Sequence, residues 1–214
     1  MLAAWGKNEK RIFVYLMMMF ENKAILSNID EINTMLRATE RDGIECVIQY
    51  MEESGFYEAP SSLYRHHNWR GGLAEHCLGV YKMAVTLDKE WNTNLPQDSL
   101  VIAGILHDVC KATKLYYDAD GIVHHRHTHV KGHGRRSVKI LERCGLSLTE
   151  DERLAIRWHM GGHHASIKEQ DEVARARQNP LWKVIHKADQ LDASGRTNMK
   201  VQNSLIVAPG TYQG

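Results

Sequence analysis

Hydrophobic positions recur with the spacing of α-helices along almost the whole chain. The first 55 residues predict three helices, over Glu9 to Leu26, Ser27 to Thr39 and around Ile44 to Met51. Ser27 or Asp30 is expected to cap the second of them. We expect this N-terminal segment, residues 1–55, to pack on a larger helical core.

A long interruption of the helical pattern separates this segment from the rest. Pro60, paired serines and the Gly71-Gly72 pair break the periodicity between Ser54 and Gly72, and imidazole and aromatic side chains follow Pro60. Loops of this length are usually functional or disordered. The composition favours an ordered loop that faces a ligand.

Five more helices and one hairpin are expected after this loop. The alternating segment Tyr116 to His127, with the turn signal Asp120-Gly121, predicts a short β-hairpin. The fold class is therefore all-α, a helical bundle with one short β-hairpin. The helices are expected over Leu73 to Trp91, Gln97 to Ala112 and Lys131 to Cys144, from the capping box of Thr149 and Glu152 to about Trp158, and from the Asn179 cap and Pro180 to about Ser194.

Composition narrows the class of function. The 214 residues include 27 Lys+Arg and 26 Asp+Glu, a net charge of +1, so no broad basic face is expected to bind duplex nucleic acid. The apolar run Ile12 to Phe20 is too short to span a bilayer and suits the core or a homodimer contact. Four cysteines without a CxxC pair suit the cytoplasm. The outlier is the count of 13 His, the commonest metal ligand.

Six histidines and aspartates fall on five separate predicted helices. Helical bundles can converge such side chains on one metal ion. Imidazole and carboxylate ligands without thiolates favour one or two divalent ions of Fe, Mn, Ni, Co or Zn. The six candidate metal ligands are His76, His107, Asp108, His133, His159 and Asp189.

Five local strings give these residues a family resemblance. The strings are RGGLAEHCLGV (70–80), AGILHDVCK (103–111), KGHGRRSV (131–138), AIRWHM (155–160) and HKADQLDA (186–193). In this order they resemble the HD-domain superfamily of metal-dependent phosphohydrolases, above all its bacterial and phage members. The resemblance implies an HD domain over residues 56–195, followed by a C-terminal tail, 196–214.

The resemblance also implies roles for the six candidates. His76, His107, Asp108 and Asp189 would hold a first metal ion. His133 and His159 would hold a second, with Asp108 as the bridge, or would face the substrate phosphate in members with one metal ion.

The function implied is hydrolysis of a phosphomonoester or phosphodiester in a nucleotide or short oligonucleotide. Metal-activated water would be the nucleophile, with Asp108 and Lys111 as the catalytic residues. Arg70, Lys111 and Arg135 would contact the small phosphorylated substrate, and Trp69 could stack on a base. Lys111 stands where members specialised for deoxynucleoside monophosphates usually have glutamate.

Two other functions fit the same residues. Dinuclear iron oxygenases of the HD fold use the same six ligand types in the same order, and a nucleotide-binding sensor would keep the metal without turnover. The histidines of residues 124–129 are interpreted as a solvated strand face or a substrate lid. His163 and His164 could add a ligand. His186 is expected to lie behind the ligands or in the core, and Asp192 to cap a helix or form a pair rather than bind metal.

Overall fold

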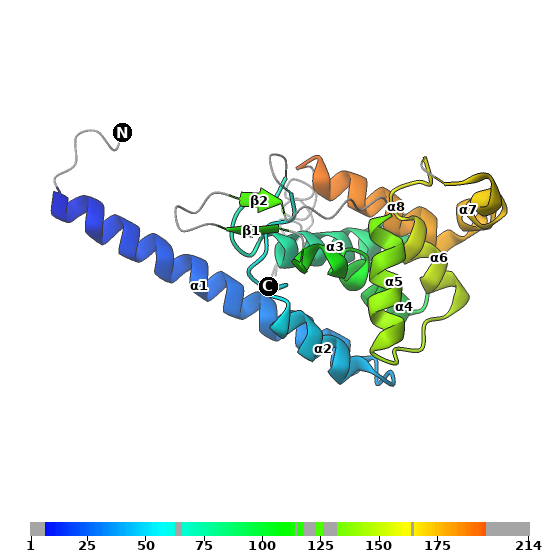
Figure 1. The fold of residues 1–214 in the computed structure, drawn as a ribbon, viewed down its shortest axis with the longest axis horizontal. Helices are drawn as coiled ribbons and strands as arrows, with labels where there is room; N and C mark the ends of the chain where they lie inside the picture. Colours follow the sequence, from blue (N-terminus) through cyan, green and yellow to red (C-terminus); the bar gives the residue numbers. More distant parts are fainter. Residues whose placement is uncertain are drawn as a thin grey trace, which may run out of the picture.

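Helices dominate the part of the chain that the structure describes (Figure 1). The computed structural model describes residues 7–62, 66–113, 115–117, 123–125, 132–163 and 165–195. The fold class is all-α, as predicted. The helices are α1 (Lys7–Ala38), α2 (Ile44–Glu53), α3 (Gly72–Trp91), α4 (Gln97–Leu106), α5 (His133–Arg143), α6 (Glu150–Trp158), α7 (Gln170–Gln178) and α8 (Pro180–Ala193), with short 3₁₀ helices η2 (Val109–Thr113) and η3 (Ile167–Glu169).

Two short strands accompany the helices. β1 (Leu115–Tyr117) and β2 (Val123–His125) pair antiparallel, with Tyr116 opposite His124. Apart from Leu115, they lie inside the segment whose alternation predicted a hairpin. The residues that join the two strands lie outside the described part of the chain.

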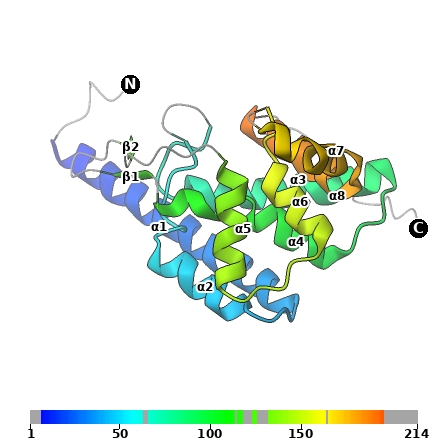
Figure 2. The ribbon, with the colours of Figure 1, turned by 45° about the vertical axis from the view of Figure 1, so that its right-hand side comes forward.

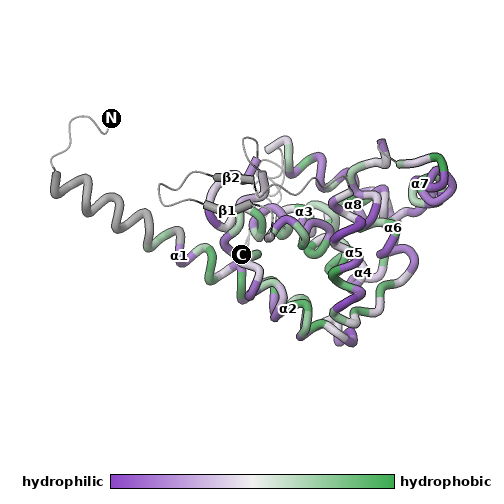
Figure 3. Tube along the Cα trace, in the orientation of Figure 1, coloured by the Kyte–Doolittle hydropathy of each residue, from purple (hydrophilic) through white to green (hydrophobic). Residues whose placement is uncertain are grey.

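Helix α3 forms the centre of the bundle, because it packs against both α4 and α8 (Figure 2). Its predicted stripe of Leu73, Cys77, Val80, Ala84 and Leu87 is buried throughout. Helices α5 and α6 pack against each other. In Figure 3, hydrophilic and hydrophobic segments alternate along α5, as expected for a helix with one buried face.

The N-terminal segment differs from its prediction in one respect. A single continuous helix, α1, replaces the two helices expected over Glu9 to Leu26 and Ser27 to Thr39. Ser27 is exposed within α1. A serine is a weak start signal when no Gly or Pro has ended the preceding helix, because the backbone hydrogen bonds then continue past it. Figure 1 shows the N-terminal half of α1 extending away from the bundle.

The helix expected over Gln97 to Ala112 ends earlier than predicted. Helix α4 ends at Leu106, His107 and Asp108 form a turn, and the 3₁₀ helix η2 follows. The amide of Lys111 donates to the carbonyl of Asp108 over 2.8 Å, which is the tighter hydrogen bond of a 3₁₀ turn. The two residues of the HD pair therefore stand at the end of a helix rather than in its middle.

Helix α7 was not predicted. The sequence does contain a signal for its start, because Ser166 and Glu169 form a capping box before α7. Only Val173 and Ala176 are buried along α7, which is too narrow an apolar stripe to identify from the sequence.

Two predicted helix caps are confirmed. Thr149 and Glu152 form the capping box of α6, and the Asn179 side chain accepts hydrogen bonds from the first amides of α8. None of the helices in the described ranges is long and apolar enough to cross a membrane.

Candidate metal centre

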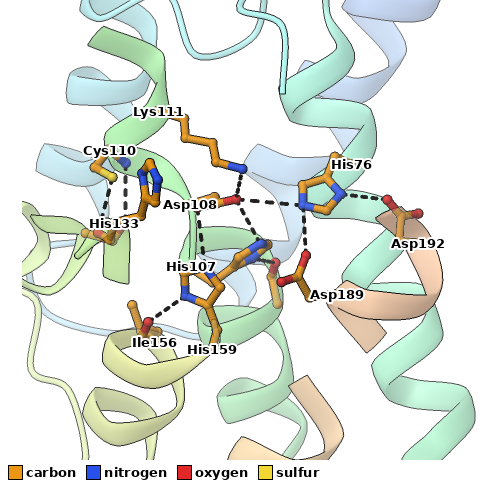
Figure 4. Close-up of polar contacts among 12 residues, drawn as sticks. His76, His107, Asp108, Cys110, Lys111, His133, Ile156, His159, Asp189 and Asp192 are labelled. Carbon is orange, nitrogen blue, oxygen red and sulfur yellow. Dashed lines mark hydrogen bonds and ion pairs between the residues drawn. The ribbon is translucent and has the colours of Figure 1, made fainter. Parts of the chain in front are cut away.

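Polar side chains from four helices converge inside the bundle (Figure 4). His76 comes from α3, the pair His107 and Asp108 from the turn after α4, His159 from the C-cap of α6, and Asp189 from α8. All five side chains are buried. A buried group of this polarity is costly unless hydrogen bonds, ion pairs or a bound cation satisfy it.

Backbone carbonyls fix the orientation of two of the imidazoles. Nδ1 of His107 donates to the carbonyl of Gly104 over 2.9 Å, and Nδ1 of His159 donates to the carbonyl of Ile156 over 2.8 Å. Because these Nδ1 atoms carry the proton, each neutral ring presents its Nε2 lone pair to the centre of the cluster. Both residues terminate their helices, so the local backbone aims the ligand atom.

The atoms that meet in the centre have no hydrogen-bond partners. These buried atoms are Nε2 of His76, His107 and His159, and Oδ1 of Asp108. Buried polar atoms without partners are rare in folded proteins, and each calls for an explanation.

The distances between these atoms explain why they lack hydrogen-bond partners. Nε2 of His76 lies 3.3 Å from Oδ1 of Asp189, Nε2 of His107 lies 3.4 Å from Oδ2 of Asp108, and Nε2 of His159 lies 3.5 Å from Oδ1 of Asp108. With metal–ligand bonds of about 2.0–2.2 Å, two ligands of one ion lie about 3–3.5 Å apart.

Within this cluster, two groups of three ligand atoms could each hold one ion. His76, His107 and Asp189 form one, and His107, Asp108 and His159 form the other, each with its atoms within 4.8 Å of one another. The cluster therefore fits one or two divalent ions bound by imidazole and carboxylate, with Asp108 facing both sets.

Charge interactions within the cluster shift the pKa values of its members. Burial raises the pKa of the Asp108 carboxyl, but Lys111 and His107 outweigh it and hold this pKa well below its usual range. Burial lowers the pKa of His76, but attraction to the neighbouring Asp189 and Asp192 carboxylates outweighs it and raises this pKa to about 9. The carboxylates are therefore charged at neutral pH, and a nearby positive charge must balance them. In the metal-free protein the protonated His76 contributes this charge, and a bound metal ion would replace that proton.

Lys111 lies at the edge of the cluster. Its Nζ is 2.6 Å from Oδ2 of Asp108, and its side chain is 16% exposed. Burial lowers the pKa of Lys111, but the neighbouring Asp108 and Asp189 carboxylates raise it, so the ammonium stays charged. This placement is compatible with the predicted role of Lys111, which is to contact a phosphate oxygen.

The sixth predicted ligand, His133, stands apart from the other five. It is half-buried at the start of α5, where Cys110 Sγ donates to its carbonyl over 3.2 Å. Among the described residues, neither set of converging ligand atoms includes it. Gly134 lets this end of α5 approach α6, because a Cβ there would overlap the carbonyl of Ile156. Metal binding by His133 stays a prediction.

The two predicted substrate arginines lie on different sides of the domain. Arg70 is 3.0 Å from Glu58 and donates to Asn22 of α1 over 3.2 Å, so it fastens the long loop to the N-terminal helix. Arg135 forms an ion pair with Glu169. Arg135 and His133 line a cavity of about 490 Å³ that Trp158, the neighbour of His159, also lines.

Sequence reasoning left the long loop's histidines without roles. His66 and His67 come from this loop, and their ring centres lie 5.2 and 5.6 Å from that of His76. The run of imidazole and aromatic residues after Pro60 was the signal, since it predicted a ligand-facing loop. Burial, followed by repulsion from His76 and Lys111, lowers the pKa of His66 to about 4.

His186 and Asp192 each contact one of the candidate ligands. Nδ1 of His186 donates to the carbonyl of His159, and the His186 ring stacks on Trp182. Asp192 accepts a hydrogen bond from His76 over 2.6 Å. His163 lines the cavity. His164 and residues 126–131 lie outside the described residues, and the side chains of His124 and His125 are not described.

Comparisons with known proteins agree with this geometry. A 72-residue stretch, 32% of the chain, is 33% identical to 29% of the dihydroneopterin 2',3'-cyclic phosphate phosphodiesterase of Methanocaldococcus jannaschii. The 3'-5' exoribonuclease YhaM of Shouchella clausii is 24% identical over 193 residues, 86% of this chain and 57% of that protein. The chain thus spans less than two thirds of either relative's length, and no solved structure matches it. The HD domain family matches residues 73–194, more than half of the chain, so this protein belongs to the HD domain phosphohydrolase superfamily.

Proposed function

We propose that this protein is a metal-dependent phosphohydrolase that cleaves a phosphodiester of a nucleotide or short oligonucleotide. The observation that carries the proposal is the convergence of three histidine Nε2 atoms and Asp108 Oδ1, all buried and without hydrogen-bond partners. In a folded protein, buried polar atoms lack hydrogen-bond partners chiefly where a ligand binds to them.

The protein's own groups supply the charge for this reaction. When bound, a divalent ion lowers the pKa of water from 15.7 to about 7 and stabilises negative charge on phosphoryl oxygens. Asp108 and Asp189 are the carboxylates that would hold the ion, and the carbonyls of Gly104 and Ile156 keep two histidines in the ligating tautomer. Lys111, charged and partly exposed beside Asp108, would neutralise a non-bridging phosphate oxygen.

The cavity beside His133 offers room for the rest of the substrate. Its volume of about 490 Å³ lies within the range of small-molecule sites. Trp158 and Met160 supply apolar surface, while Arg135 and Arg157 supply positive charge that Glu169 balances in the free protein. A nucleoside group fits this mixture of apolar wall and cationic rim.

The relatives favour a phosphodiester over a phosphomonoester. One is named a cyclic phosphate phosphodiesterase and the other an exoribonuclease, and both activities break a phosphodiester bond. We therefore propose that the substrate is either a ribonucleotide with a 2',3'-cyclic phosphate or a short oligoribonucleotide that is cleaved at its 3' end.

A substrate screen tests the proposal. Metal-stripped protein would be loaded in turn with Mn²⁺, Ni²⁺, Co²⁺, Fe²⁺ or Zn²⁺. Each form would then be assayed with bis-p-nitrophenyl phosphate, 2',3'-cyclic nucleotides, dinucleotides and nucleoside monophosphates. We expect hydrolysis of the diesters in the loaded protein and none in the stripped protein.

Two other outcomes would replace the proposal. Two bound irons with O₂ consumption and no diesterase activity would favour the HD-fold dinuclear oxygenase. Nucleotide binding without turnover under every metal would favour the silent sensor.

A further inference from the structure

Asp192 lies between two imidazoles that come from different parts of the chain. One of its oxygens, Oδ2, is 2.6 Å from Nδ1 of His76 and 2.9 Å from Nε2 of His67. The Asp192 side chain is 3% exposed and that of His67 is 13% exposed, so water has little access to the group. Because a carboxylate only accepts hydrogen bonds, both rings must donate to it.

The direction of the His76 bond matters for metal binding. When Nδ1 of His76 donates to Asp192, the neutral ring carries its lone pair on Nε2. That atom is the one that faces Asp189 and the centre of the cluster. Asp192 therefore does for His76 what the backbone carbonyl of Gly104 does for His107.

Helix packing leaves a place for this carboxylate. Asp192 stands one turn after Asp189 on α8, so both residues face α3. Gly79 lies on α3 opposite Asp192, and a Cβ at this glycine would overlap the Asp192 carboxylate. The close approach of the carboxylate to α3 thus depends on a residue without a side chain.

The long loop supplies the second donor. The amide of Ser61 donates to the carbonyl of His67 over 2.8 Å, and His67 has a positive φ of 50°. The backbone of the loop is therefore bent so that the His67 ring reaches Asp192. The ring also packs against Trp69, with ring centres 5.0 Å apart.

We propose that Asp192 and His67 are positioning residues that hold His76 in its metal-ligating tautomer and couple residues 66–71 of the long loop to the metal centre. The inference rests on the proposed metal-dependent function. Partners of metal-bound histidines typically change metal affinity or activity 10–100-fold when they are mutated.

A different arrangement makes an opposite prediction. His67, His76 and Asp192 also offer three ligand atoms within 4.8 Å of one another, so they could hold an ion of their own. In that case Nδ1 of His76 would be a ligand rather than a donor. Metal stoichiometry distinguishes the two arrangements.

The experiment compares Asp192→Asn and His67→Gln with the wild type. Co²⁺ binding to metal-stripped protein would be followed by titration calorimetry and by the visible absorption of the bound ion. Asp192→Asn should weaken binding about 10–100-fold at unchanged stoichiometry and alter the spectrum. His67→Gln should weaken binding less, because His76 keeps its direct partner.

Asp88→Asn is the matched control. Asp88 lies near the other end of α3, where its carboxylate accepts from Thr93 and from the amide of Leu95. This variant should lower the unfolding temperature and leave Co²⁺ affinity within twofold of the wild type.

Three results would overturn the proposal. They are affinity unchanged in Asp192→Asn, loss of a whole equivalent of metal in either variant, and a wild type that binds no Co²⁺. The last result would also remove the proposed function. Metal binding that depends on Asp192 in a protein without diesterase activity would reject the proposed function and leave this inference standing.

Discussion

Two buried polar clusters in this domain differ in how completely they are hydrogen-bonded. Glu152, which has no exposed surface, accepts from two nitrogens of Arg41 over 2.9 and 3.2 Å, from Ser99 over 2.7 Å and from the amide of Thr149 over 2.8 Å. Every oxygen of this carboxylate is satisfied. The Glu152 cluster joins α6 to α4 and to the turn after α1.

The metal centre, by contrast, leaves four ligand atoms without a hydrogen-bond partner. Both clusters bury charge, and both draw on residues far apart in the sequence. Completeness of hydrogen bonding is what separates them, because a satisfied cluster needs no ligand and an unsatisfied one does. This difference is what we expect between a buried polar group that serves folding and one that serves binding.

The largest effect is expected from removing the HD pair. His107→Ala combined with Asp108→Ala should abolish metal binding and lower diesterase activity at least about 10⁴-fold, because the metal chemistry is lost. Activity and metal content would be measured on protein whose helicity is unchanged by circular dichroism. Asp171→Asn, at an exposed position of α7, is the control. Full activity in the double variant would disprove the metal mechanism.

Breaking the Glu152 cluster should act on stability instead. Glu152→Ala leaves the Arg41 charge largely buried without its partner, and such losses cost about 3–5 kcal/mol. Urea unfolding would measure the change, while metal content per folded molecule should stay that of the wild type.

The exposed pair of Arg37 and Glu45 offers a matched control. Their side chains are 53% and 69% exposed, so Glu45→Ala should lower the free energy of unfolding far less than Glu152→Ala. Equal losses in Glu152→Ala and Glu45→Ala would contradict the distinction between the two clusters.

Metal binding at the centre should also depend on pH. Because the pKa of His76 is raised to about 9 in the metal-free protein, a proton must leave before the metal binds. Metal affinity should therefore rise about tenfold per pH unit from pH 6 to pH 8. Competition between Co²⁺ and a chelator, corrected for the chelator's own protonation, would measure this slope.

The stability of the metal-free protein should change in the opposite sense. The raised pKa of His76 contributes stability that is fully present below about pH 6.5, and this contribution is lost as the pH rises through about 9. Urea unfolding of stripped protein at pH 6 and pH 9.5 tests the sign. A metal affinity that is independent of pH would show that His76 is neutral before the ion binds.

The smallest effect concerns a single hydrogen bond at the edge of the Glu152 cluster. Thr149→Ala removes the side chain that accepts from the amide of Glu152 over 3.2 Å, and loss of such a cap costs about 1 kcal/mol. Thr149→Ser should restore most of the loss in thermal unfolding. A loss as large as that of Glu152→Ala would mean that the cap, rather than the buried ion pair, holds α6 in place.

The sequence predicted the metal centre better than its surroundings. The ligand-bearing helices carry strong signals, such as the apolar stripe around His76 and the Asn179 cap before Asp189. Four separate helices must converge to bring five of the six candidates together. The resemblance to the HD superfamily supplied that convergence, because helical periodicity alone does not say which helices are neighbours.

Local backbone hydrogen bonds and tertiary contacts determined what the sequence did not predict. The tightened turn that ends α4 before the HD pair depends on local backbone hydrogen bonds that no residue type signals. The contact between His67 and Asp192 joins residues 125 positions apart, since 192 − 67 = 125. Helix α7 was not predicted because only two of its side chains are buried.

The position of the HD pair at the end of α4 has a consequence for changes in chain length. Each residue of an α-helix rotates the following side chain by about 100°. One insertion between Gln97 and Leu106 would therefore turn His107 and Asp108 away from the other ligands, although no ligand would be replaced. An insertion in the connection 92–96 would leave the angular phase of every ligand-bearing helix intact. The site should thus tolerate variation in the lengths of such connections and reject it within its helices.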